Sequence, residues 1–240
     1  MTDLVILHRA GDAPSNTVFR PGGFGPDDPL APYRERAGDE LPAVAAGRVR
    51  FQGDLHVARF PHIETLVVVE GRLTVAAAGA EALVLGTGEG AVIGRGADVR
   101  IRADAPATFV FYASAGSESG PDGVAALRAD ANFKPSTTTL PAEVLLGPAP
   151  DCRSDNVFTD EARGYQAGTW DSTPYHRIVR AHRVHEFMYI VDGEVRFEKP
   201  DGSSETVAAG DAVFVPQTAP IGWESRARVA KFYVVQPAQA

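Results

Sequence analysis

The sequence has few of the features that cross-link a chain or carry it into a membrane. It has a single cysteine, Cys152, which excludes a disulfide within the chain and favours a reducing, cytoplasmic setting. The N-terminus lacks a basic start, and its apolar run from Leu4 to Leu7 is too short for a signal peptide. No apolar stretch approaches the roughly 20 residues that span a bilayer. We therefore expect no membrane partner.

Positive charge is also scarce. The 240 residues include 23 Lys and Arg against 31 Asp and Glu, which gives a formal net charge of −8, and basic residues form no consecutive block. Nucleic acids and anionic membrane surfaces attract basic proteins, so neither is an expected partner.

Long helical patterns are rare in the sequence, whereas turn-forming residues are common. The 24 glycines and 18 prolines favour a β-rich protein. A chain of 240 residues suits one large domain or two small ones, with ample length for a core.

The chain contains two copies of one pattern. Residues 64–71 (ETLVVVEG) match residues 186–193 (EFMYIVDG) at an offset of 122 residues, and this register continues from residue 73 to residue 93. A one-residue slip then aligns residues 109–112 with residues 232–235. We interpret the pattern as a duplicated domain. The boundary is expected near residue 120, which gives domains 1–120 and 121–240.

Each copy is predicted to consist of short antiparallel strands. Val195 and Phe197 alternate with charged residues, as in a half-buried strand, and Asp201–Gly202 is typical of a hairpin turn. Frequent turn signals predict an all-β chain built of barrels or sandwiches. Residues 8–45 are expected to form an extended arm, and residues 122–131 a short helix in the linker.

The repeated pattern resembles the cupin family. It has a glutamate, six intervening residues and a glycine, then a hairpin and a glycine-led strand that ends in proline at Pro216. Residues 167–174, 186–193 and 210–216 resemble the subgroup that includes ureidoglycine aminohydrolase-like and ethanolamine-utilisation-type proteins. The resemblance implies a bicupin with two tandem jelly-roll barrels, packed side by side about a pseudo-two-fold axis. Cupins often form homodimers, which is a further expectation.

The resemblance also raises the question of a metal. The usual cupin ligands are two histidines one residue apart, a glutamate three or four residues later, and a histidine about five residues past the later proline. His182 and Glu186 fit this frame, but Arg180 and Ile221 occupy the other two positions. Arginine has no acceptor and cannot bind a cation. We therefore expect no metal cofactor; the alternative is a divalent transition metal held by His182, Glu186 and His176.

The first copy matches the metal frame less well. It keeps Glu64, but Ala58, Phe60 and Val99 stand at the other ligand positions. His56 and His62 lie on the same strand face as Glu64, although off the family frame. Whether the first barrel has a site is left open.

The second copy offers a candidate site. Arg180, His182 and Glu186 are catalytic candidates because they share one strand parity, which faces the barrel interior in a cupin. Arg180 suits a substrate carboxylate, His182 could act as a general acid or base, and Glu186 could orient it or take the opposite proton role. The predicted substrate-binding residues are Arg180, Met188, Trp223, Tyr175 and Trp170. His185 and Tyr189 have the other parity and are expected to face away.

Three hypotheses follow for the function. The first is a bicupin that binds, and as an enzyme would transform, a small polar carboxylate-bearing metabolite without a conventional metal. If it is an enzyme, a hydrolase, isomerase or lyase is expected. The second is a metal-dependent cupin enzyme, aminohydrolase-like or dioxygenase-like, with unconventional ligands. The third is a non-catalytic ligand-binding or regulatory cupin. The alternative to all three is that Arg180, His182 and Glu186 form an internal ion pair that only stabilises the barrel.

Overall fold

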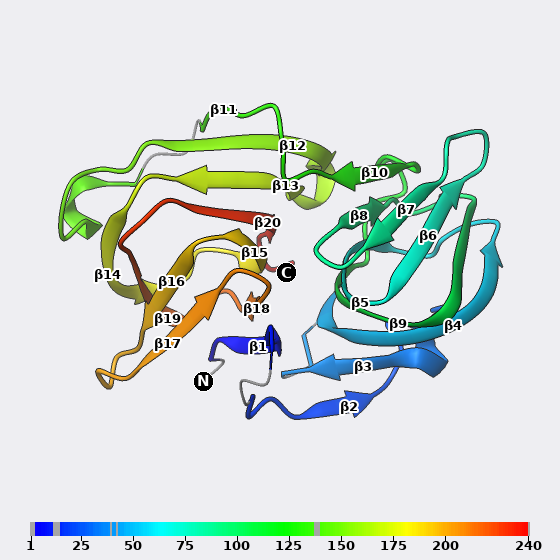
Figure 1. Cartoon of the computed structure of the whole chain (residues 1–240), viewed down its shortest axis with the longest axis horizontal. Helices are drawn as coiled ribbons and strands as arrows, with labels where there is room; N and C mark the ends of the chain where they lie inside the picture. Colours follow the sequence, from blue (N-terminus) through cyan, green and yellow to red (C-terminus); the bar gives the residue numbers. More distant parts are fainter. Residues whose placement is uncertain (1–2, 12–14, 39, 42, 137–139, 240) are drawn as a thin grey trace.

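Two β-barrels lie side by side in the chain (Figure 1). The computed structural model describes residues 3–11, 15–38, 40–41, 43–136 and 140–239. In Figure 1 the first barrel is on the right in blue to green, and the second is on the left in yellow to red. No helix among the described residues is long and apolar enough to cross a membrane.

The first barrel contains a large antiparallel sheet with the order β10-β8-β5-β9-β4-β3-β2, and β6 and β7 form a hairpin that joins it through β9. Its strands are β2 (Phe19–Pro21), β3 (Arg34–Ala37), β4 (Val44–Val57), β5 (Ile63–Glu70), β6 (Arg72–Ala77), β7 (Leu83–Gly86), β8 (Gly90–Ile93), β9 (Val99–Ser114) and β10 (Val124–Leu127). A single turn of 3-10 helix, η1 (Ala31–Tyr33), precedes β3.

The second barrel has two sheets, with the orders β1-β18-β15-β20-β13-β12-β11 and β14-β19-β16-β17. Its strands are β1 (Val5–His8), β11 (Lys134–Pro135), β12 (Cys152–Asp160), β13 (Tyr165–Ser172), β14 (Tyr175–Ala181), β15 (His185–Asp192), β16 (Glu194–Glu198), β17 (Ser204–Ala208), β18 (Ala212–Val215), β19 (Pro220–Ser225) and β20 (Val229–Gln236). Short 3-10 turns, η2 (Ala142–Val144) and η3 (Glu161–Arg163), interrupt the linker and the β12–β13 connection. The predicted all-β fold with a hairpin at Asp201–Gly202 is confirmed.

The two barrels exchange strands. The N-terminal strand β1 pairs with β18 of the second barrel, and β10, which precedes the second barrel, pairs with β8 of the first. The helix predicted for residues 122–131 is therefore wrong, because this segment satisfies its backbone groups on the free edge of β8. Strand pairing crosses residue 120 in both directions, and the division of domains there stays a prediction.

The register of the two copies is continuous. Glu64 lies opposite Ala113 on β9, and Glu186 lies opposite Val235 on β20, so the offset is still 122 residues in the last strand. Both strand pairs also share one bulge, between Val68 and Glu70 in the first copy and between Ile190 and Asp192 in the second. The one-residue slip predicted for residues 109–112 is therefore wrong.

Apolar side chains form three clusters. One fills the first barrel, one lies inside the second, and one lies between the barrels. The cluster between the barrels includes Tyr112, Tyr165, Phe187, Phe214 and Phe232. The predicted packing of apolar outer faces against each other is confirmed, and the face opposite to this layer in each sheet points into a barrel.

Two glycines mark where the arm strands cross closely over the barrels. A Cβ on Gly47 would lie 2.1 Å from the carbonyl oxygen of Glu35, and a Cβ on Gly168 would lie 2.1 Å from that of Asp155. The two sites occupy equivalent places, because Gly47 pairs with Phe111 on β9 and Gly168 pairs with its counterpart on β20.

We expect Gly47→Ala and Gly168→Ala each to lower the free energy of unfolding by about 1–3 kcal/mol, because backbone atoms must move apart. Urea denaturation measures the change. Gly147→Ala is the matched control, since no atom lies within 4 Å of its Cβ position. Equal stability of all three variants would contradict the close crossing.

Candidate functional site

The second barrel contains a partly open cavity of about 510 Å³. Residues of β12, β13, β15 and β20 form most of its wall, and Tyr175 of β14, two linker residues and the β14–β15 loop complete it. The lining residues are Ser136, Leu140, Cys152, Ser154, Asn156, Gln166, Trp170, Tyr175, Arg183, Val184, Glu186, Lys231, Tyr233 and Val235. This volume falls within the range of small-molecule sites.

Glu186 is at the centre of the polar contacts beside this cavity. Lys231 Nζ donates to Glu186 Oε1 over 2.7 Å, and His182 Nε2 donates to Glu186 Oε2 over 2.8 Å. Burial alone would raise the pKa of Glu186, but the Lys231 ammonium group and the hydrogen bond from His182 outweigh it and hold that pKa well below its usual value. Glu186 is therefore ionised throughout the physiological range and is a weak base.

Lys231 is the main residue of this candidate site that the sequence did not reveal. Its side chain is only 7% exposed, and its ammonium group lies 4.6 Å from the ring centre of Trp170 and 5.0 Å from that of Trp223. The predicted slip aligned Lys231 with Thr108, a residue at the protein surface. The true register aligns it with Phe109 in the interior of the first barrel. A lone lysine in the apolar run VAKFYVV was the available signal.

The tyrosines and the cysteine of the cavity wall are held in their neutral forms. Burial, aided by the negative charge of Glu186, raises the pKa of Tyr233 to about 12, and the Tyr233 hydroxyl donates to Asn156 Oδ1. Burial also raises the pKa of the Cys152 thiol and that of Tyr175. None of these shifts moves a group toward neutral pH, where a general acid or base works best.

A cluster of arginines adjoins the cavity. Arg177 is 7% exposed, and none of Arg177, Arg180 and Arg183 forms an ion pair with a described residue. Burial and the neighbouring guanidinium groups of Arg177 and Arg183 lower the pKa of Arg180. The Nε atoms of Arg177 and Arg180 are buried without a partner in the described part of the chain. Arg177 is buried and Arg180 half-buried, whereas Arg183 is exposed. A buried guanidinium group without an ion-pair partner is costly unless an anion joins it.

The structure brings most of the predicted substrate-binding side chains together. Trp170 and Tyr175 line the cavity, whereas Met188 and Trp223 pack in the apolar cluster behind them. Trp223 contacts both of the lining rings. Its ring centre lies 5.9 Å from that of Trp170 in an edge-to-face arrangement and 5.4 Å from that of Tyr175 in a stacked arrangement. Arg180 is half-buried beside this group but is not among the lining residues.

The predicted histidines lie in three different places. His182 is behind Glu186, 9% exposed and outside the cavity wall. His176 instead contacts Glu198 over 3.1 Å, because a bulge between Arg177 and Arg180 reverses the strand parity that the sequence suggested. His185 is buried against Phe214 between the barrels, so its expected direction, away from the interior, agrees with the structure.

The residues present do not fit a conventional cupin metal. Among the described residues, no group of three or more His, Cys, Asp or Glu side chains is close enough to hold an ion. Glu186 and His182 remain, but the Lys231 ammonium group already lies 2.7 Å from the carboxylate, where a cation would bind. With His176 turned toward Glu198, the alternative ligand set is not assembled.

The first barrel is filled where the second is hollow. Arg34, from β3 of the arm, is fully buried, donates to Glu64 Oε2 over 2.6 Å and also pairs with Asp28. His62 also contacts Glu64, at 2.9 Å, whereas His56 lies at the surface with Asp98. The large apolar side chains of the first barrel are buried around Arg34, so its interior is packed.

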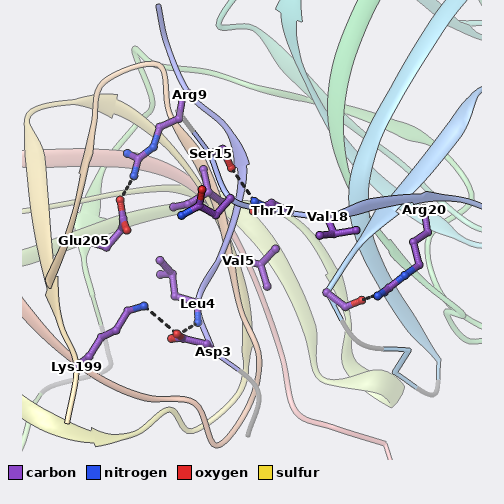
Figure 2. A pocket seen from close by; sticks show the side chains of 13 residues that line it. Asp3, Leu4, Val5, Arg9, Ser15, Thr17, Val18, Arg20, Lys199 and Glu205 are labelled. Atoms are coloured by element: carbon purple, nitrogen blue, oxygen red, sulfur yellow. Dashed lines mark hydrogen bonds and ion pairs between the residues drawn. The ribbon is translucent and has the colours of Figure 1, made fainter. Parts of the chain in front are cut away.

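A separate hollow of about 380 Å³ lies between the N-terminal segment and the second barrel (Figure 2). Figure 2 shows Arg9 pointing toward Glu205, and Lys199 toward Asp3. These charges compensate one another, in contrast to the arginines beside the cavity of the second barrel.

Comparison with known proteins now identifies the family. A solved structure from Pseudomonas syringae pv. tomato str. DC3000, of unknown function and assigned to the DUF861 family, is 40% identical; the match covers 98% of this chain and 100% of that chain, with a TM-score of 0.92. The chain belongs to the DUF861 family. The model of the EutQ-like cupin domain matches residues 159–233. Together with the fold, these matches confirm a bicupin of the cupin superfamily.

More distant structures share the bicupin fold alone. A cupin 2 conserved barrel domain protein from Leptotrichia buccalis is 11% identical, with a TM-score of 0.53, and the match covers 84% of this chain and 86% of that chain. A salicylate 1,2-dioxygenase mutant from Pseudoaminobacter salicylatoxidans is 11% identical, with a TM-score of 0.50 and coverage of 82% and 72%. No curated protein matches the chain in sequence.

The pairing of Glu186 with Lys231 can be tested by a double-mutant cycle. We expect Lys231→Met to lower the free energy of unfolding by about 3 kcal/mol at pH 7, because it leaves a buried carboxylate without its cation. Lys231→Met/Glu186→Leu should recover part of this loss. Because the folded-state pKa of Glu186 is depressed, its stabilising effect should be present above about pH 4.3 and fade as the pH falls further.

Urea denaturation at several pH values measures the cycle. Lys199→Met is the control, since this lysine pairs with Asp3 at the surface and should cost less than about 1 kcal/mol. A double variant that is as unstable as Lys231→Met alone would contradict the pairing.

Proposed function

We propose that the second barrel of this bicupin binds a small polar metabolite that carries a carboxylate. The observation that carries the proposal is the cluster of Arg177, Arg180 and Arg183, which forms no ion pair with a described residue and adjoins a cavity of about 510 Å³. Arg183 lies in the wall itself, whereas the charge of Lys231 is already balanced by Glu186. A ligand carboxylate would supply the missing anion.

The cavity wall suits both ends of such a ligand. Trp170 and Tyr175 offer apolar surface, and the exposed rim carries the amides of Asn156 and Gln166. Binding sites for small metabolites combine apolar walls with a few convergent polar groups. Lys231 neutralises the negative charge of Glu186, so this carboxylate repels a bound anion only weakly.

The same wall supports binding more directly than acid–base turnover. Glu186 is locked in its ionised form, while Tyr233 and Cys152 are held in their protonated forms. His182 contacts Glu186 from outside the cavity, so its predicted role as a general acid or base would have to act through that carboxylate. In this proposal Glu186 and His182 position Lys231, which supports the non-catalytic hypothesis. The homodimer and the cytoplasmic setting stay predictions.

The carboxylate preference is tested with a matched pair of probes. We expect propionate to bind more tightly than propionamide, which has the same shape without the charge. The only two tryptophans, Trp170 and Trp223, lie in the second barrel, so their fluorescence reports binding there. Arg183→Ala should weaken propionate binding about tenfold or more, as expected for loss of a charge-assisted contact. Arg72→Ala, an exposed arginine of the first barrel, is the control.

A second variant tests whether the cavity is the site. Ser154 and Lys231 occupy the strand positions that Arg34 and Phe109 have in the first barrel. The double variant Ser154→Arg/Lys231→Phe therefore fills the second barrel as the first is filled, so it should stay folded and lose propionate binding. Ser154→Ala keeps the cavity open and should bind as the wild type does. Equal affinity for propionate and propionamide, or unchanged binding by the double variant, would contradict the proposal.

The alternative of a metal-dependent cupin has its own test. We expect protein purified without chelator to contain far less than one equivalent of transition metal by elemental analysis, because the donors present are too few and face an ammonium group. One equivalent of metal that disappears in His182→Ala, but not in His56→Ala, would establish the metal-dependent hypothesis instead.

A further inference from the structure

The two barrels have equivalent rows of paired residues across neighbouring strands. One row of the first barrel contains Arg34, Val49 and Phe109, and the equivalent row of the second contains Ser154, Trp170 and Lys231. The next row places Phe111 of the first barrel at the position of Tyr233 in the second. Each barrel thus has an aromatic ring in the same place, one row from the glutamate.

In the first barrel this aromatic ring carries a planar group. The guanidinium carbon of Arg34 lies 4.0 Å from the ring centre of Phe111, and its Nη2 atom donates to Glu64. The chain's own arm therefore fills the first barrel with a flat, conjugated head on an aromatic ring. This contact is favourable because the π face attracts the positive charge of the guanidinium group, and the same face can pack against an aromatic ring in an offset arrangement.

In the second barrel the same place is open. Ser154 is too short to reach the ring of Tyr233, and both residues line the cavity. The cation that neutralises the glutamate comes from another strand instead, because Lys231 reaches Glu186 from β20. The Tyr233 ring is fixed by its hydroxyl, which donates to Asn156. The second barrel therefore keeps the aromatic ring but lacks the group that covers it.

We infer that the ligand of the second barrel carries its carboxylate on a planar, conjugated body that lies on Tyr233, in the place that the Arg34 guanidinium has on Phe111. This inference rests on the proposed function, since it describes the ligand of the same cavity. The planar group is an anion rather than a second guanidinium, because both oxygens of Glu186 already accept hydrogen bonds, from Lys231 and His182.

The test compares benzoate with cyclohexanecarboxylate, which have the same charge and similar size but differ in planarity. Binding is measured on the full chain by tryptophan fluorescence and by calorimetry. We expect benzoate to bind about threefold to tenfold more tightly, the range that aromatic stacking supplies. Benzamidine, which is planar but positively charged, should bind far more weakly than benzoate.

Two variants of the ring complete the experiment. Tyr233→Phe keeps the aromatic face and should retain the preference for benzoate, whereas Tyr233→Leu should bind the two acids equally. Circular dichroism confirms that each variant is folded. Equal binding of both acids by the wild-type chain would overturn the inference and leave the carboxylate proposal standing. If neither acid binds to the folded chain, the proposed function fails together with this inference.

Discussion

A buried glutamate at the same place in each barrel, and the cation that neutralises it, determine how the two halves of the molecule differ. Glu64 and Glu186 both lie on the inner face of the central sheet, where a lone charge would be expensive. In the first barrel the cation is Arg34, which enters from the arm and fills the interior. In the second it is Lys231, which reaches across from a barrel strand and leaves a cavity open.

The choice of cation also decides the chemistry available to the second barrel. Lys231 occupies the place beside Glu186 that a cupin metal would take, and it keeps the carboxylate ionised. The arginines near the cavity form no ion pair in the described part of the chain, which supports the proposal of an anionic ligand in the second barrel.

The sequence predicted much of the fold, because alternating apolar residues and turn signals act locally. The duplication, the all-β architecture and the outward direction of Tyr189 all followed from periods of two residues and from the repeat. The candidate site was harder to predict. The bulge before Arg180 turned His176 toward Glu198, and the slip in the last strand concealed Lys231. The segment at residues 122–131 became a strand because a sheet edge was available for it.

The sequence by itself determined the two barrels, the glutamate in each, and the presence of Arg180 and Ile221 at two of the usual cupin ligand positions, since these depend on residue identity and spacing. Only the tertiary structure decided which cation meets each glutamate. Arg34 is 30 residues from Glu64, and Lys231 is 45 residues from Glu186. Contacts over such separations depend on strand register and bulges, and a shift of one residue reverses the face on which every side chain lies.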